Sequence, residues 1–111
     1  MYSGRAASIA SCAMTDIARM GSTVAVRPAP LSRFDAECMI DETGLGAMLA
    51  SARRGRPSDR TALVEALLGV GRLMAEHGSR IAELDVNPLR VLLEGDGVLA
   101  LDGLVAVRED E

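Results

Sequence analysis

Four oxygen-bearing side chains in the last third of this 111-residue sequence could do chemistry together. Glu83, Asp85 and Asn87 alternate with apolar residues, so on an extended strand all three project from one face. Asp102 lies in the apolar run that follows the turn-forming segment 94–97. An amide carbonyl and a carboxylate on neighbouring strands form a sparse oxygen-only site, which suits Mg²⁺ better than zinc.

The turn between these two strands decides whether the side chains meet. A turn centred between Glu94 and Gly95 places Asn87 directly opposite Asp102, on the same face of a hairpin. A turn shifted by one residue on each side leaves the two residues diagonal, and an odd-residue loop puts them on opposite faces. The pattern is also typical of an ordinary solvent-facing strand edge, so the metal-site prediction depends on the register.

A long helix before this region is the most distinct element of the sequence. Its apolar side chains recur at helical spacing on one face: Leu63, Leu67, Val70 and Met74. The motif Pro57-Ser58-Asp59 is a helix-start signal, with an N-cap candidate followed by an acid in the positive first turn. We expect the helix to continue to about His77, with Gly78 as its C′ residue.

Shorter elements precede this helix. The β-branched run 23–27 predicts a strand that stops at Pro28, because proline lacks the donor that a ladder needs. Ser32 or Asp35 is placed to cap the next helix. A short helical turn is predicted over 45–50.

The last third of the sequence is predicted to be β-structure. Strands are expected over 81–87 and 89–93, interrupted at Pro88, with a return strand over 98–107. In the first of these, Ala82 is expected to share the apolar face. Together with the helices, these strands predict an α+β fold with an antiparallel sheet and helices on one face.

Composition narrows the function classes. A net charge of −4, a pI near 5.0 and only one Tyr and one Phe argue against a nucleic-acid binder. All 12 basic residues are Arg, so this sequence offers no Schiff-base or phosphate-binding Lys. Cys12 and Cys38 match no metal or redox spacing. Since no apolar run reaches the ~18 residues of a membrane helix, we expect a cytoplasmic protein without membrane contact.

The amino-acid sequence of the predicted β region resembles that of a known family. Residues 83–89, a Gly-containing turn and residues 100–103 resemble the end of the ATP-grasp domain of ADP-forming acyl-CoA synthetases, which are related to the succinyl-CoA synthetase β subunit. Three upstream stretches are similar to the strand with its Ala-Pro-Leu turn, the next helix and the Arg-Gly-x-Pro loop of that family: 26–31, 34–40 and 49–59. The resemblance covers roughly residues 22–107, and its most specific part is Glu-Leu-Asp-x-Asn-Pro-Leu.

The resemblance implies roles for individual residues. Asn87 and Asp102 are expected to hold the Mg²⁺ of bound ATP. Glu83 and Asp85 are second choices, which either orient the site or form salt bridges. Arg54 and Gly55 best match the family's basic loop, which implies a contact with nucleotide phosphate or CoA. A solvated loop explains the same two residues more simply. CoA is expected to bind elsewhere in the full enzyme.

The resemblance also implies a divided chain. Residues 22–107 are expected to form a partial ATP-grasp domain, like the C-terminal half of an ATP-grasp subdomain, followed by a charged tail at 108–111. Residues 1–21 diverge from the family, and four of them recur near helical spacing, which predicts a short amphipathic helix: Ile9, Ala13, Ile17 and Met20.

The leading function hypothesis is a part or subunit of an ADP-forming acid–thiol ligase, which makes acyl-CoA from a carboxylic acid, CoA and ATP. This chain is expected to contribute the Mg-nucleotide side of the site. We expect no catalysis from the isolated chain, because the family's other lobe and its Lys residues have no counterpart here. The alternative is a non-catalytic remnant or interaction module that self-associates or binds a partner subunit.

Overall fold

The computed structural model describes residues 6–9, 25–51, 55–86 and 88–109. The elements run in this order: β1 (Ala6–Ile9), β2 (Ala25–Pro28), α1 (Arg33–Glu42), α2 (Leu45–Ala50), α3 (Arg60–His77), β3 (Ile81–Val86), β4 (Leu89–Val91), β5 (Val98–Ala100) and β6 (Gly103–Val107). The strands pair antiparallel as β1–β2, β3–β6 and β4–β5. The α+β class is therefore confirmed, with three two-stranded ladders in place of a single sheet over the described residues.

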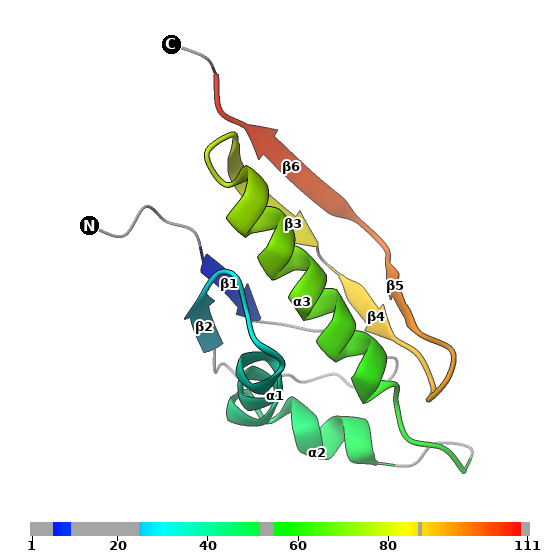
Figure 1. The fold of residues 1–111 in the computed structure, drawn as a ribbon. Helices are drawn as coiled ribbons and strands as arrows, with labels where there is room; N and C mark the ends of the chain where they lie inside the picture. The colour runs from blue at the N-terminus through cyan, green and yellow to red at the C-terminus, as the bar shows by residue number, and fades with distance from the viewer. Residues whose placement is uncertain (1–5, 10–24, 52–54, 87, 110–111) are drawn as a thin grey trace.

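A long two-stranded ribbon lies along α3. β3 and β6 form one end of the ribbon, and β4 and β5 continue it to a hairpin tip at the other (Figure 1). α1 and α2 pack on the opposite side of α3 from this ribbon (Figure 1). Among the helices that the structure describes, none combines the length and apolar character needed to span a bilayer.

The hydrophobic core lies where α3 packs against α1 and α2. Its buried side chains include Ala36, Met39, Ile40, Leu45, Leu49, Leu63, Val64, Leu67 and Val91. The apolar face predicted for α3 is confirmed, since Leu63, Leu67 and Met74 are buried. Val91 of β4 belongs to the same cluster, and Val98 of β5 packs against it. The core thus anchors the tip half of the ribbon to the helices.

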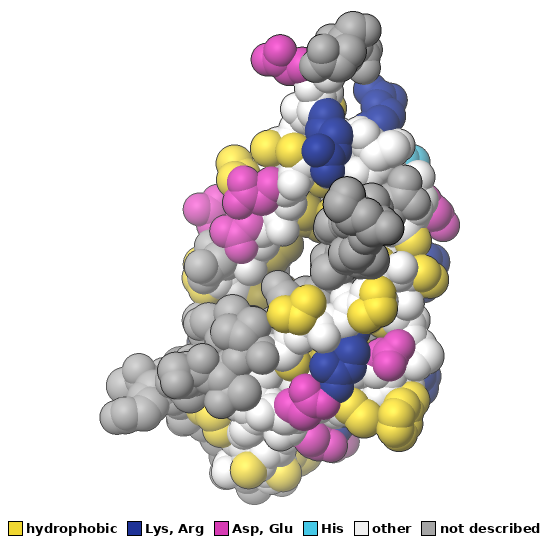
Figure 2. Space-filling view, turned by 90° about the vertical axis from the view of Figure 1, so that its left-hand side faces the viewer, with side chains coloured by type: hydrophobic (Ala, Val, Ile, Leu, Met, Phe, Trp, Pro, Cys, Tyr) yellow, Lys and Arg dark blue, Asp and Glu magenta, His cyan; other side chains and the backbone are white. Residues whose placement is uncertain are grey.

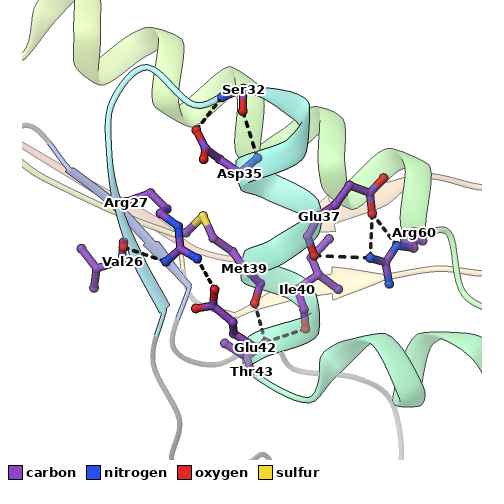
Figure 3. A network of polar contacts seen from close by, with 10 residues as sticks. All are labelled: Val26, Arg27, Ser32, Asp35, Glu37, Met39, Ile40, Glu42, Thr43 and Arg60. Carbon is purple, nitrogen blue, oxygen red and sulfur yellow. Dashed lines mark hydrogen bonds and ion pairs between the residues drawn. The ribbon is translucent and has the colours of Figure 1, made fainter.

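Polar contacts define α1 and tie it to its neighbours (Figure 3). Ser32 is the N-cap: its Oγ accepts from the Asp35 N–H at 3.0 Å, while Asp35 Oδ2 accepts from the Ser32 N–H at 3.0 Å. The backbone N–H of Ser32 lowers the pKa of Asp35, and the Ser32 side chain adds to this effect. Of the two caps considered from the sequence, Ser32 is therefore correct. Arg27 of β2 forms an ion pair with Glu42 at the other end of α1.

The caps at the two ends of α3 differ from the prediction. Asp59, not Ser58, is the N-cap, because Ser58 is held in a bridge opposite Leu93 and leaves the capping position to the next residue. No acid occupies the first turn of α3. Gly78 is the C-cap residue with φ of −62°, rather than a left-handed C′ residue. The predicted last residue, His77, is confirmed.

A strand occupies part of the segment that was predicted to be helical. β1 pairs with β2 from Ala6 opposite Pro28 to Ile9 opposite Ala25. Ladder bonds to a distant strand here outweigh the weak helical periodicity of a small-residue segment, because pairing context dominates β-structure. The other residues of the predicted helix, at 10–21, lie outside the described residues.

The β3 strand carries a register shift. The ladder with β6 is irregular between Ile81 and Glu83, so that Ile81 is buried and Ala82 is exposed. The placement of Ala82 on the apolar face was therefore wrong, since a bulge changes which face the next residue occupies. Beyond the shift the predicted alternation is confirmed. Glu83 and Asp85 are exposed, whereas the residues between and after them are half-buried.

Replacing Gly71 with Ala should lower the urea midpoint of unfolding. The added Cβ would lie 3.0 Å from Leu31 Cγ and 3.2 Å from Leu31 N. Such overpacking typically costs about 1–3 kcal/mol, against about 1 kcal/mol gained in helix propensity. Gly69→Ala is the matched control on the same helix, because its Cβ would meet nothing within 4 Å. Gly69→Ala should be neutral or stabilising, and equal midpoints for the two variants would contradict the close approach of α3 to Leu31.

Candidate functional site

The tip of the ribbon is a tight turn centred between Glu94 and Gly95. Asp96 N donates to Leu93 O at 2.8 Å across this turn. Gly95 and Gly97 have φ of +92° and +89°, a left-handed conformation that glycine adopts without strain. Of the three turns that the sequence allowed, the structure has the one centred between Glu94 and Gly95.

One register runs from the tip through both ladders of the ribbon. In the β4–β5 ladder, Leu89 lies opposite Ala100. In the β3–β6 ladder, Val86 lies opposite Gly103, which continues the same register without a slip. Asp102 falls in the interval between the two ladders.

Asp102 is exposed, and one carboxylate oxygen accepts from the Gly103 N–H at 2.8 Å. A solvated carboxylate of this kind fits Mg²⁺, which prefers oxygen donors and keeps several of its waters. Asn87, the predicted partner of Asp102, lies outside the described residues. The donor chemistry at Asp102 is therefore compatible with a magnesium–nucleotide complex.

The ladder separates Glu83 from Asp102. Glu83 lies opposite Ala106 of β6, four positions from Asp102, which is about 13 Å along a strand. Asp85 lies opposite Leu104 and is the nearer acid, as a diagonal neighbour of Asp102. Over the part of the chain that the structure describes, no group of three or more His, Cys, Asp or Glu side chains is arranged to hold a metal ion.

The basic loop before α3 is tied to the hairpin tip. Arg54 lies outside the described residues. Gly55 is exposed with φ of +83°, and no atom lies within 4 Å of the position its Cβ would take. Arg56 donates to Glu94 O at 3.0 Å and to Asp96 Oδ2 at 3.4 Å. Arg56 of the basic loop is therefore bound to the hairpin tip.

A shallow pocket of about 240 Å³ lies between α2, the start of α3 and the hairpin tip. Arg60 lines it, together with Glu94 and other residues of these elements. The Arg60 guanidinium donates to Glu37 at 2.8 Å through Nε and to Asp41 at 3.1 Å through Nη2. Its charge is therefore balanced by two acids of α1 (Figure 3 shows the contact with Glu37).

Asp59 is the residue of this region whose contact sequence reasoning missed. Its side chain is buried, with 7% exposed, and the carboxylate accepts three backbone N–H groups: Ala62 at 3.1 Å, Gly95 at 3.1 Å and Gly97 at 2.8 Å. Burial opposes ionisation, but the three N–H donors outweigh it and hold the pKa of Asp59 below its usual value. The sequence signalled a helix start and a turn, but no local pattern joins segments 36 residues apart.

The sequence profile of the ATP-grasp domain matches residues 15–107, and the chain belongs to this family. The β subunit of ADP-forming acetate–CoA ligase II from Pyrococcus furiosus is 34% identical over 85 residues, which are 77% of this chain and 36% of that subunit. The solved structure of PH1788 from Pyrococcus horikoshii Ot3 matches with 32% identity and a TM-score of 0.71, over 78% of this chain and 36% of that one.

A second solved structure is the dinucleotide-forming acetyl-coenzyme A synthetase 1 of Ca. Korarchaeum cryptofilum, in complex with coenzyme A and Mg-AMPPCP. It is 36% identical with a TM-score of 0.66, over 77% of this chain and 38% of that one. The chain thus spans little more than a third of these relatives. The resemblance to part of the ATP-grasp domain of ADP-forming acyl-CoA synthetases is confirmed.

The stabilising effect of Asp59 should disappear in acid. Because the folded-state pKa of Asp59 is lowered, its contribution is present above the ordinary value of about 3.9 and is lost as the pH falls toward the folded-state value. At pH 6 the free energy of unfolding of Asp59→Asn should lie about 1–3 kcal/mol below that of the parent chain.

Urea titrations of both proteins at pH 6 and below pH 4 measure this difference. The gap should narrow in acid, since a protonated Asp59 resembles Asn in charge. Asp35 has a lowered pKa as well, but it is present in both proteins and its effect cancels. A gap that stays constant or widens in acid would contradict the role assigned to the Asp59 carboxylate.

Proposed function

We propose that this chain supplies the magnesium–nucleotide side of an ATP-grasp site, as a part or subunit of an ADP-forming acyl-CoA ligase. Two relatives support the proposal: one is named as a subunit of such a ligase, and the other has been solved with Mg-AMPPCP and coenzyme A. Residues 22–107 form the proposed partial domain. The remaining lobe is expected from another segment or a partner subunit, with CoA bound elsewhere in the full enzyme.

The observation that carries this proposal is the register of the ribbon. The pair Val86–Gly103 on one side and the pair Leu89–Ala100 on the other frame Asp102 in a single continuous register. If that register continues by one position from Val86–Gly103, or by two positions from Leu89–Ala100, Asn87 lies opposite Asp102. An amide carbonyl and a carboxylate then face one another across two strands, as the family resemblance requires.

We propose distinct roles for the residues near this pair. Asp102 offers a carboxylate oxygen and Asn87 an amide oxygen to Mg²⁺. A magnesium ion held by these two residues would supply positive charge to offset that of the nucleotide phosphates during phosphoryl transfer. Arg54 and Gly55 are proposed to contact phosphate or CoA, with Gly55 leaving room for close approach. Glu83 is too far along the ladder to share the ion with Asp102, so its proposed role is orientation of the strand.

A second candidate function is an interaction module that self-associates or binds a partner subunit. The return strand exposes about half of five large apolar residues: Leu99 at 48%, Leu101 at 54%, Leu104 at 51%, Val105 at 54% and Val107 at 59%. Apolar side chains also reach the surface between charged ones on the face drawn in Figure 2. Sedimentation velocity with Leu104→Arg, and with Phe34→Arg as a distant exposed control, separates this candidate from a monomeric nucleotide-binding module.

Substituting Asp102 by Asn should weaken binding of Mg-ATP to the chain by at least about tenfold, since even outer-shell partners of metal ligands typically contribute that much. Isothermal titration calorimetry at constant free Mg²⁺ measures the affinity. Asn87→Ala should have a similar effect, because it removes the second oxygen donor. Glu76→Gln is the matched control, because it removes one exposed negative charge from α3.

The control should keep the affinity of the parent chain. Equal affinities for the parent chain, Asp102→Asn and Asn87→Ala would contradict the proposed site. Saturable binding that is lost in both variants and kept in Glu76→Gln would support it.

A further inference from the structure

We infer that Asp59 is a positioning residue for the candidate site: its carboxylate selects the turn at the hairpin tip and thereby sets which residue faces Asp102. The effect on nucleotide binding rests on the proposed function, whereas the effect on the register does not. Asp59 lies outside the Asn87–Asp102 pair and acts on it through the ribbon.

The contacts of Asp59 join two distant segments. Oδ1 caps α3 by accepting from the Ala62 N–H at 3.1 Å. Oδ2 accepts from the Gly95 N–H at 3.1 Å and from the Gly97 N–H at 2.8 Å. One buried carboxylate therefore accepts from an N–H group in the first turn of α3 and from the two N–H groups on either side of Asp96 at the hairpin tip.

Backbone bonds place the two segments side by side. Asp59 N donates to Leu92 O at 2.8 Å, and Glu94 N donates to Pro57 O at 2.8 Å. Ser58 forms an isolated antiparallel bridge with Leu93. The first strand of the hairpin is thus held against the segment before α3, and the Asp59 side chain reaches past it to the two glycine donors.

The tip sequence permits more than one turn. Asp96-Gly97 is a strong two-residue hairpin signal, because both residues tolerate positive φ. A turn centred there would move the residue opposite Val86 from Gly103 to Val107, about 13 Å further along the strand, and would shift every other pair by the same amount. A shift of a single position would put paired side chains on opposite faces.

The observed turn is the one in which both glycine N–H groups point at Asp59. Gly95 and Gly97 have φ of +92° and +89°, and their N–H groups both donate to Oδ2 of Asp59. Centring the turn on Asp96-Gly97 would place these groups at different positions of the hairpin and break that convergence. The buried carboxylate then loses two of its three donors, which disfavours the alternative register.

Asp59→Asn in the whole chain tests this inference. Asn keeps one side-chain oxygen, so it still caps α3, but its amide nitrogen cannot accept from Gly95 and Gly97. Asp35→Asn is the matched control, because it removes a carboxylate that closes the capping box at the start of α1 and not the turn of the hairpin. Both variants are compared at a temperature well below the midpoint of their thermal unfolding, so that the folded state is observed.

The readout is the strand register in solution. Leu92 N donates to Gly97 O, and Leu101 N donates to Pro88 O. Hydrogen-bonded and non-hydrogen-bonded pairs alternate along an antiparallel ladder, so Leu89 and Ala100 form a non-hydrogen-bonded pair, in which the two Cα atoms lie close together. The parent chain and Asp35→Asn should give a strong Hα–Hα cross-peak for this pair in nuclear Overhauser spectra. Asp59→Asn should lose this cross-peak or share it with one from a shifted pairing.

An unchanged Leu89–Ala100 cross-peak in Asp59→Asn would overturn the inference. Calorimetry with Mg-ATP separates this failure from that of the proposed function. If Asp59 acts through Asp102, Asp59→Asn should weaken binding, and the double variant with Asp102→Asn should bind no more weakly than Asp102→Asn alone. Additive losses would overturn the positioning role. A shifted register with affinity insensitive to Asp102 would support the inference and contradict the proposed function.

Discussion

The buried carboxylate of Asp59 is the interaction on which the arrangement of the site depends. It accepts from Ala62 at the start of α3 and from Gly95 and Gly97 at the tip of the ribbon. A carboxylate with three backbone donors remains ionised despite its burial, which the lowered pKa of Asp59 reflects. The helix start and the hairpin turn are therefore positioned by the same side chain.

The rest of the molecule consists of a packed part and a solvated part of the ribbon. The helices and the β4–β5 ladder share one core, to which Val91 and Val98 contribute from the ribbon. Asp102 and the exposed apolar side chains of the return strand lie further along the same ribbon, on its solvated part. Such a division fits a partial ATP-grasp domain.

Local patterns in the sequence predicted much of this fold. The α3 helix and the capping of α1 follow from periodicity and from residues with strong conformational preferences. The turn at Glu94–Gly95 was one of three turns that the sequence allowed. The resemblance that pointed to Asp102 also rested on a local motif. Asn87, the other half of the predicted pair, stays a prediction.

Long-range contacts account for what the sequence did not predict. β1 is a strand because of its pairing with β2, and the shift at Ile81 arises from the ladder with β6. The contact of Asp59 with the tip spans 36 residues and follows from no local pattern. The most direct test of the site is paramagnetic broadening of amide resonances by Mn²⁺-ATP. The account predicts that broadening centres on Asp102 and Gly103, and broadening centred on the basic loop near Gly55, or spread evenly over the chain, would contradict it.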